Sequence, residues 1–216
     1  MLDSDLDCFY RILGDLVQAG RVRRLSDCHG RMSWPERGVY FFFEPGEVRK
    51  NGSPRVVRIG THAVSQGSRT RLWQRLSQHR GTSGGVGNHR GSIFRLHVGG
   101  ALLDRDKALN PEPGCWGFRS SAPSPEARIA EEHVERAVSA HIGNMPFTWV
   151  AINDAPSRSS DRRHIEINSI ALLAAAHAAG LEAASPDWLG RFSRAPEIRR
   201  YGLWNIDGVS DPYSPT

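Results

Sequence analysis

Cysteine, lysine and long apolar runs are all scarce in this chain of 216 residues. The three cysteines stand far apart and form no C-x-x-C pair, which argues against a disulfide framework and against a cysteine-ligated zinc. No apolar run reaches the roughly 18 residues of a membrane span, and no basic, apolar and small-residue series opens the chain as a secretory signal would. From these absences we expect a protein of the reducing cytoplasm with no membrane partner.

Two catalytic signatures are missing as well. The sequence G-x-x-x-x-G-K-[ST] does not occur, so a P-loop nucleotide site is not expected. No two histidines stand four residues apart, so the H-x-x-x-H pair of a zinc hydrolase is not available either.

Arginine is abundant where lysine is not. Only Lys50 and Lys107 are lysines, so arginine supplies 26 of the 28 basic residues, and the formal net charge is +5. A guanidinium group binds phosphate as a planar fork, which an ammonium group cannot do. The charge permits a polyanionic partner. A GC-rich genome would also enrich arginine, and the composition leaves both explanations open.

Apolar periodicity, caps and turn residues predict an α+β fold. We expect a small antiparallel or mixed three-stranded sheet flanked by helices, with an N-terminal helix and a C-terminal tail that packs back over the domain. Turn residues in 45–54 indicate that the first two strands form a hairpin. The expected helices cover 4–20, 68–81, 92–103, 125–141 and 161–180, and the expected strands cover 37–44, 55–60 and 146–152.

The helix predicted after the second strand carries three cationic or titratable side chains in a row. Arg71, Arg75 and His79 are four residues apart and share one helical face, next to the buried stripe of Leu72 and Leu76. Such a row can address a phosphate from a single rigid element.

An ordered series of short motifs surrounds this helix. "GVY" lies at 38–40, "RIG" at 58–60, "LWQRL" at 72–76, and Glu166 lies in the helix after the third strand. The series resembles the GIY-YIG nuclease superfamily, in which a GIY strand pairs with a YIG strand and an L-x-x-R-L helix follows. The resemblance implies a nuclease domain over 37–180 with an insertion around 81–125. An N-terminal helical arm over 1–36 and a C-terminal extension over 181–216 would flank it.

The resemblance also implies roles for the motif residues. Arg75 would stabilise the charge of the transition state, and Glu166 would bind Mg²⁺ or Mn²⁺. Tyr40 or His79 would activate the water; the general base stays open between these two. Arg58 and Arg71 would position the phosphate. The expected substrate is DNA, with RNA left open, and cleavage of both strands by one site per chain would favour a homodimer.

One motif departs from the family pattern. Arg58 replaces the first tyrosine of the second motif, and the spacer of 17 residues before it is longer than the usual hairpin. An arginine cannot act as a base, because its pKa stays above about 12. His62 is then a substitute proton acceptor to consider. The alternative is an inactive nucleic-acid-binding module of the same fold.

Further candidates for DNA contacts lie outside these motifs. His89 and Arg90 stand in the glycine-rich loop 81–92, and Asn205 or Asn168 would correspond to the C-terminal asparagine of the family, with Asn205 preferred. Each residue also has a purely structural interpretation when it is taken alone. Tyr40 could pack in a sheet, Arg75 could be a solvated charge, and Glu166 could be the partner of a surface ion pair.

Overall fold

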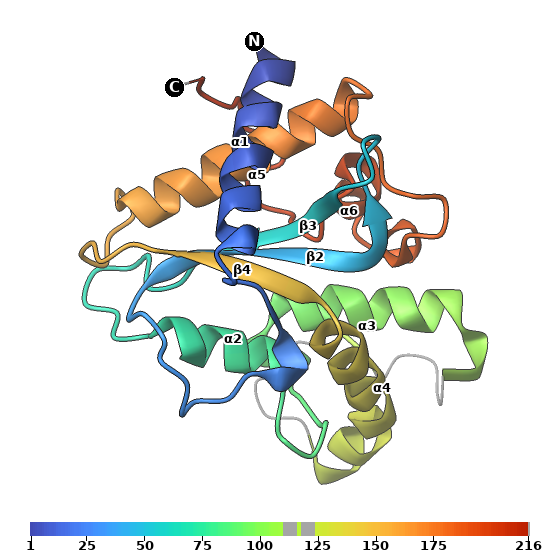
Figure 1. The fold of residues 1–216 in the computed structure, drawn as a ribbon. Coiled ribbons are helices and arrows are strands. Elements are labelled where there is room, and N and C mark those ends of the chain that lie inside the picture. The colour runs from blue at the N-terminus through green and yellow to red at the C-terminus, as the bar shows by residue number, and fades with distance from the viewer. Residues whose placement is uncertain (110–115, 118–123, 216) are drawn as a thin grey trace.

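The structure is a computed structural model that describes residues 1–109, 116–117 and 124–215. The described residues form an α+β fold in which an antiparallel sheet has helices on both faces (Figure 1). Cys115 and most of the connector expected over 110–125 lie outside the described residues.

The sheet contains four strands in the order β1-β4-β2-β3, and every neighbouring pair is antiparallel. Their bounds are β1 Arg23–Arg24, β2 Gly38–Val48, β3 Pro54–Gly60 and β4 Pro146–Ala151. The predicted hairpin is the pair β2–β3. The prediction of three strands missed β1, because two consecutive arginines give no apolar alternation by which a strand could be detected.

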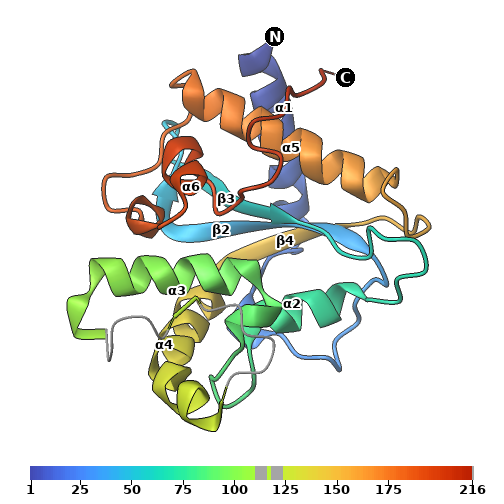
Figure 2. The same cartoon turned by 180° about the vertical axis from the view of Figure 1, so that it is seen from behind.

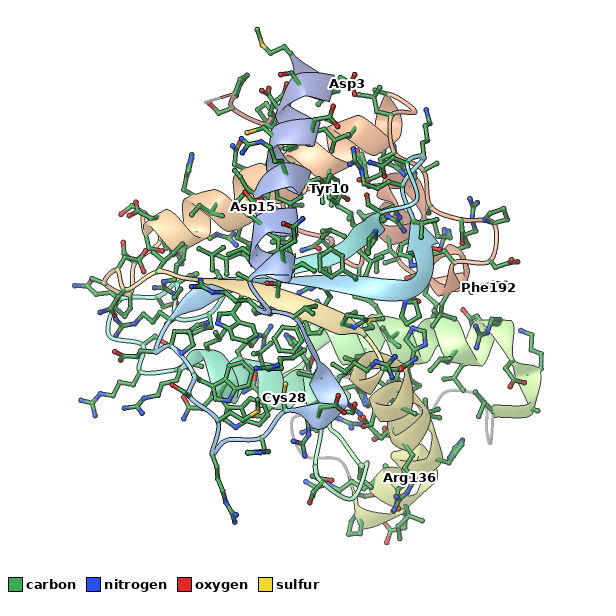
Figure 3. The ribbon with its side chains drawn as sticks, viewed as in Figure 1. Asp3, Tyr10, Asp15, Cys28, Arg136 and Phe192 are labelled. Atoms are coloured by element: carbon green, nitrogen blue, oxygen red, sulfur yellow. The ribbon has the colours of Figure 1, made fainter. Side chains whose placement is uncertain are left out.

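Two layers of helices cover the sheet (Figures 1 and 2). One face carries α1 and α5, and the opposite face carries α2, α3 and α4, while the short helix α6 belongs to the C-terminal segment. In Figure 3, Tyr10 lies on the α1 side of the sheet, whereas Cys28 and Arg136 lie on the α2–α4 side. The bounds are α1 Leu2–Gln18, α2 Leu72–Arg80, α3 Ile93–Arg105, α4 Pro125–Gly143, α5 Asp161–Ala178 and α6 Pro196–Tyr201.

The central strand β2 explains why both faces need a cover. Successive side chains of a strand point to opposite faces. Val39, Phe41 and Phe43 therefore pack with α1 and α5, while Tyr40 and Phe42 pack with α2 and α3. All five are buried, which accounts for an uninterrupted apolar run where a half-exposed strand would alternate.

Two predicted helix starts differ from the structure. Helix α2 begins at Leu72, with Arg71 as its N-cap residue, instead of after Ser68. Helix α5 is capped by Ser160, whose Oγ accepts a hydrogen bond from Arg163 N at 3.3 Å, instead of by Asp161. Ser, Asp and neighbouring polar residues are nearly equivalent caps, so the sequence alone does not select one of them.

The C-terminal segment packs onto the hairpin through buried polar groups. Trp188 Nε1 and Trp204 Nε1 each donate a hydrogen bond of 2.9 Å to Glu44 Oε2, and His141 Nε2 lies 3.0 Å from Glu44 Oε1. These partners lower the pKa of the Glu44 carboxyl although its burial alone would raise it. The segment therefore adds to the core on the α3 side of β2. The domain boundaries predicted from the sequence stay predictions.

Candidate active site

The end of the β2–β3 hairpin brings Tyr40 and His79 into direct contact. Tyr40 lies on β2 directly opposite Gly60 on β3 and Trp149 on β4. Its Oη lies 2.8 Å from Nε2 of His79, which is located in the last turn of α2. Both side chains are fully buried. The first residue of this pair comes from the GVY motif, and the second is the histidine one turn after the motif arginine.

Gly60 leaves the space that Tyr40 occupies. A Cβ atom at Gly60 would lie 2.3 Å from Tyr40 Oη and 2.5 Å from Cζ, which is closer than real Cβ contacts. The glycine that ends the second motif is therefore required by the tyrosine of the first.

The other ring nitrogen of His79 is also bonded. Nδ1 lies 2.8 Å from Oγ of Ser92, the N-cap residue of α3. Arg95 donates from Nη1 to the backbone oxygen of His79 at 2.8 Å. Burial lowers the pKa of His79 well below its usual value, and the charges of Arg75, Arg58 and Arg95 lower it further. His79 is therefore a neutral imidazole at neutral pH.

Arg58 lies in the same buried region with little to neutralise it. Nη1 donates to Trp204 O at 2.5 Å, but Nε has no hydrogen-bond partner. Arg58 forms no ion pair with a carboxylate in the described part of the chain. Burial lowers the pKa of its guanidinium, whereas Tyr40 and Glu166 raise it. The Nε group of Arg58 is thus a buried donor without a partner, close to Tyr40 and Glu166. Such a donor is typical of a group that binds an anion during function.

Glu166 reaches the site from α5 on the other face of the sheet. Its Oε1 accepts a hydrogen bond of 3.0 Å from Thr61 N, just past the end of β3, and Thr61 Oγ1 donates to Gly38 O at 2.9 Å. Its Oε2 pairs with Nη1 of the half-buried Arg163 at 2.7 Å. These bonds hold the carboxylate at the motif ends of both hairpin strands.

Arg75 lies one turn before His79 and is partly exposed. Its Nη1 donates to Gln78 Oε1 at 3.0 Å and contacts Gly91 O at 3.5 Å, and it pairs with no carboxylate in the described residues. Arg71, at the start of the same helix, is exposed. The row predicted from the sequence thus has a buried imidazole at one end and solvated guanidinium groups along the rest.

His62, the substitute base suggested by the sequence, is close to the site but poorly suited to accept a proton. Burial lowers the pKa of His62 to about 4, and Arg162, Arg37 and Arg75 contribute to the same shift. Its Nε2 lies 3.3 Å from Glu36 O, and Nδ1 has no partner among the described residues.

His89 and Arg90 are held by α4. The ring Nδ1 of His89 lies 3.0 Å from Glu135 Oε1, and Arg90 forms two hydrogen bonds of 2.7 Å with the carboxylate of Glu131. These contacts hold the glycine-rich loop against the helix, so in the free protein neither side chain is available to a phosphate. Their proposed DNA contacts stay predictions.

The two candidate asparagines occupy different places. Asn205 is buried and bonds both backbone groups of Ile59, with distances of 3.1 Å from Ile59 N and 2.9 Å from Ile59 O. Asn168 makes the same kind of paired contact with the backbone of Ser214, near the C-terminus. Only Asn205 lies beside the second motif.

The structure thus brings together Tyr40, Arg58, Arg75, His79 and Glu166 around the motif end of the hairpin. Ser92 and Thr61 also contact site residues, and neither was predicted from the sequence. The position of Ser92 directly before the apolar run of α3 predicts an N-cap serine, but nothing in the sequence indicates that its hydroxyl also contacts His79.

Comparison with known proteins identifies the family of the chain. A model of the GIY-YIG domain matches residues 2–216, almost the whole chain. The chain therefore belongs to the GIY-YIG family, a family of endonucleases, and its expected activity is of the nuclease class. No curated protein and no solved structure matches the chain.

A hard divalent cation fits this set of residues only through a single carboxylate. Within the described ranges, no three His, Cys, Asp or Glu side chains gather closely enough to hold a metal ion. Glu166 keeps lone pairs on both oxygens beyond its bonds to Thr61 and Arg163. Mg²⁺ commonly takes one or two carboxylates and fills its other positions with waters and substrate oxygens.

Among the residues that the structure describes, no helix is long and apolar enough to cross a membrane.

Proposed function

We propose that the protein is a metal-dependent endonuclease that hydrolyses phosphodiester bonds in DNA. The observation that carries this proposal is the buried Tyr40–His79 hydrogen bond of 2.8 Å, with Arg58 beside it and Glu166 fixed at the adjacent strand ends. Solvated side chains or ordinary core packing would not require a tyrosine, an imidazole and an unpaired guanidinium in one buried place.

In this reaction Tyr40 acts as a phenolate and takes the proton of the attacking water, and His79 holds the tyrosine oxygen in place. Tyr40 is fully buried, so DNA binding has to open a path by which the water reaches its oxygen. Tyr40 is favoured over His79 as the general base because the arginines around His79 oppose the second proton that a base must accept.

The arginines act on the phosphate. Arg75 is partly exposed, pairs with no described carboxylate, and offers its fork to the oxygens that gain charge in the transition state. Arg71 and Arg58 position the same phosphate group. Glu166 would hold Mg²⁺ or Mn²⁺, which supplies positive charge for the phosphate and the leaving oxygen when it is bound.

The test is incubation of supercoiled plasmid with the purified protein, with Mg²⁺ or with a chelator. The proposal predicts nicked or linear plasmid with Mg²⁺ and intact plasmid with the chelator. Glu166→Gln is the matched variant, because its amide oxygen can still accept the hydrogen bond from Thr61 N. It should fold normally and lose cleavage.

Binding of the plasmid without any cleavage under either metal would contradict the proposal and favour an inactive nucleic-acid-binding module. Equal cleavage by Glu166→Gln and the parent would remove Glu166 as the metal ligand. Linear product formed without a nicked intermediate would indicate two chains acting together, as a homodimer would.

A further inference from the structure

A chain of three buried side chains runs from the strand to the start of α3. Tyr40 Oη lies 2.8 Å from His79 Nε2, and His79 Nδ1 lies 2.8 Å from Ser92 Oγ. The side chains of Tyr40 and His79 are not exposed at all, and Ser92 is 1% exposed. Bulk water therefore does not share in these two contacts.

The hydrogens in this chain outnumber its hydrogen bonds. A neutral imidazole carries one N–H, and each hydroxyl carries one O–H, which makes three hydrogens for two contacts. One hydroxyl hydrogen is left without a partner in the chain as long as Tyr40 is a phenol. When Tyr40 is a phenolate, two hydrogens remain, one for each contact, and none is left over.

The surroundings of Ser92 decide where the surplus hydrogen lies. Ser92 Oγ accepts a hydrogen bond from Arg95 N at 3.3 Å, so the amides at the start of α3 point toward this oxygen. These donors repel a hydroxyl hydrogen directed at them, and no carbonyl or carboxylate of the described residues accepts one from Ser92. The hydroxyl of Ser92 is therefore best directed at His79 Nδ1.

This direction fixes the rest of the chain. With Nδ1 as the acceptor, the proton of a neutral His79 lies on Nε2 and is donated to the oxygen of Tyr40. A second proton on the ring is opposed by burial and by the groups that surround it. Arg58 and Arg75 approach from β3 and α2, and Arg95 approaches from α3, where Glu135 of α4 partly neutralises it.

We propose that Ser92 sets the tautomer of His79, so that His79 donates to Tyr40 and leaves that oxygen free to give up its own proton. Ser92 is thus a positioning residue, because it acts on the base through His79. The proton of Tyr40 leaves to solvent before the reaction, and the phenolate then receives the proton of the attacking water. The catalytic part of this inference depends on the proposed nuclease function, but the tautomer does not.

The experiment measures the tautomer directly. Two-bond ¹⁵N–¹H spectra distinguish a protonated ring nitrogen from an unprotonated one, and comparison with His79→Gln assigns the signals of His79 among the nine histidines. The parent should show Nε2 protonated and Nδ1 unprotonated at neutral pH. In Ser92→Asp the carboxylate still caps α3 but can only accept, so Nδ1 should become protonated. Ser92→Thr keeps the hydroxyl and should keep the tautomer of the parent.

A protonated Nδ1 in the parent, or an unchanged tautomer in Ser92→Asp, would overturn the proposal. The spectra can be recorded whether or not the protein cleaves DNA, so a failure of the proposed function would be recognised separately as an absence of plasmid cleavage by the parent.

Cleavage supplies the second measurement. Ser92→Asp and Ser92→Ala should slow cleavage by roughly 100-fold, as for other losses of general-base function. Ser92→Thr keeps the hydroxyl and should cleave at close to the rate of the parent. Ser124→Ala is the control, because Ser124 caps α4 in the same way, with Oγ accepting from Ala127 N at 3.2 Å, and does not contact the site. A fall in melting temperature shared with Ser124→Ala, with cleavage unaffected, would reduce Ser92 to an ordinary cap.

Discussion

Two buried arginines of β3 have opposite electrostatic surroundings, although they are only three residues apart. Arg55 is paired with the carboxylate of Glu47 and donates to Gly202 O at 2.6 Å. Arg58 has no such carboxylate and leaves Nε without a partner. A buried charge costs free energy unless it is paired, so the stability of the fold does not account for Arg58.

Replacement of each arginine by methionine should separate these roles. Arg55→Met leaves Glu47 with an uncompensated buried charge, and we expect it to lower the free energy of unfolding by about 3–5 kcal/mol. Arg58→Met should change that free energy by less than about 1 kcal/mol, because the removal of an unpaired buried charge offsets the loss of the hydrogen bond to Trp204 O. Urea unfolding measures both. Plasmid cleavage should fall about 100-fold in Arg58→Met. A large loss of stability in Arg58→Met would instead assign Arg58 a structural role.

The buried ring of His62 makes stability depend on pH in a defined window. The pKa of His62 is about 4 in the folded chain, below the 6.5 of an unperturbed histidine, so the unfolded chain binds more protons between these values. Stability contributed by the neutral ring is complete above pH 6.5 and is lost as the pH falls toward 4. In His62→Gln, the decrease in the free energy of unfolding over this pH range should be smaller by about 2 kcal/mol. Thermal unfolding from pH 7.5 to 4 measures it, with His164→Gln as the control; an equally steep decline in both variants would contradict the assignment.

At the scale of elements, the C-terminal segment closes the open edge of the sheet. Strand β3 is the last in the order, and an unpaired edge strand tends to pair with other chains. Trp204 N donates to Val57 O at 2.7 Å, and Asn205 satisfies both backbone groups of Ile59. The segment thus holds the second motif in the place of a fifth strand.

Two asparagines allow this contribution to be measured. Asn205→Ala leaves two buried backbone groups of Ile59 without partners, and we expect a loss of about 2–3 kcal/mol in the free energy of unfolding. Asn168→Ala removes the same pair of bonds from Ser214 at an exposed site and should cost less than about 0.5 kcal/mol. Chemical denaturation compares the two. Equal losses would show that burial at β3 is not what makes Asn205 important.

For the whole molecule, an excess of exposed arginine should dominate binding to nucleic acid. The net charge is +5, and Arg69 and Arg71 near the start of α2 are exposed without ion pairs to described residues. Affinity for DNA should fall steeply with salt, and Arg71→Ala should reduce the slope of log K against log salt by about 1. Arg194→Ala, which removes an exposed arginine already paired with Asp104, is the control. A salt-independent affinity would contradict binding through phosphates.

Much of this molecule could be predicted from its sequence, because periodicity and caps are local signals. The hairpin, the apolar strand β2 and the helices around the motifs follow from them, and the α+β fold is confirmed. Strand β1 could not be predicted, because it exists only through its pairing with β4. The engagement of Arg90 by Glu131 is also a contact between distant residues, and no local pattern reveals it. Ser92 is the clearest case: its cap is readable from the sequence, but its contact with His79 is not.

The most direct test of the proposed nuclease centre is Mg²⁺-dependent plasmid cleavage by Tyr40→Phe. This change removes one oxygen and its hydrogen bond to His79 while it keeps the ring that packs against Phe42. The rate should fall by about 100-fold or more, as expected when a general base is lost, with the melting temperature nearly unchanged. Cleavage at the parent's rate by a folded Tyr40→Phe protein would contradict the assignment of Tyr40 and His79 as the reactive pair.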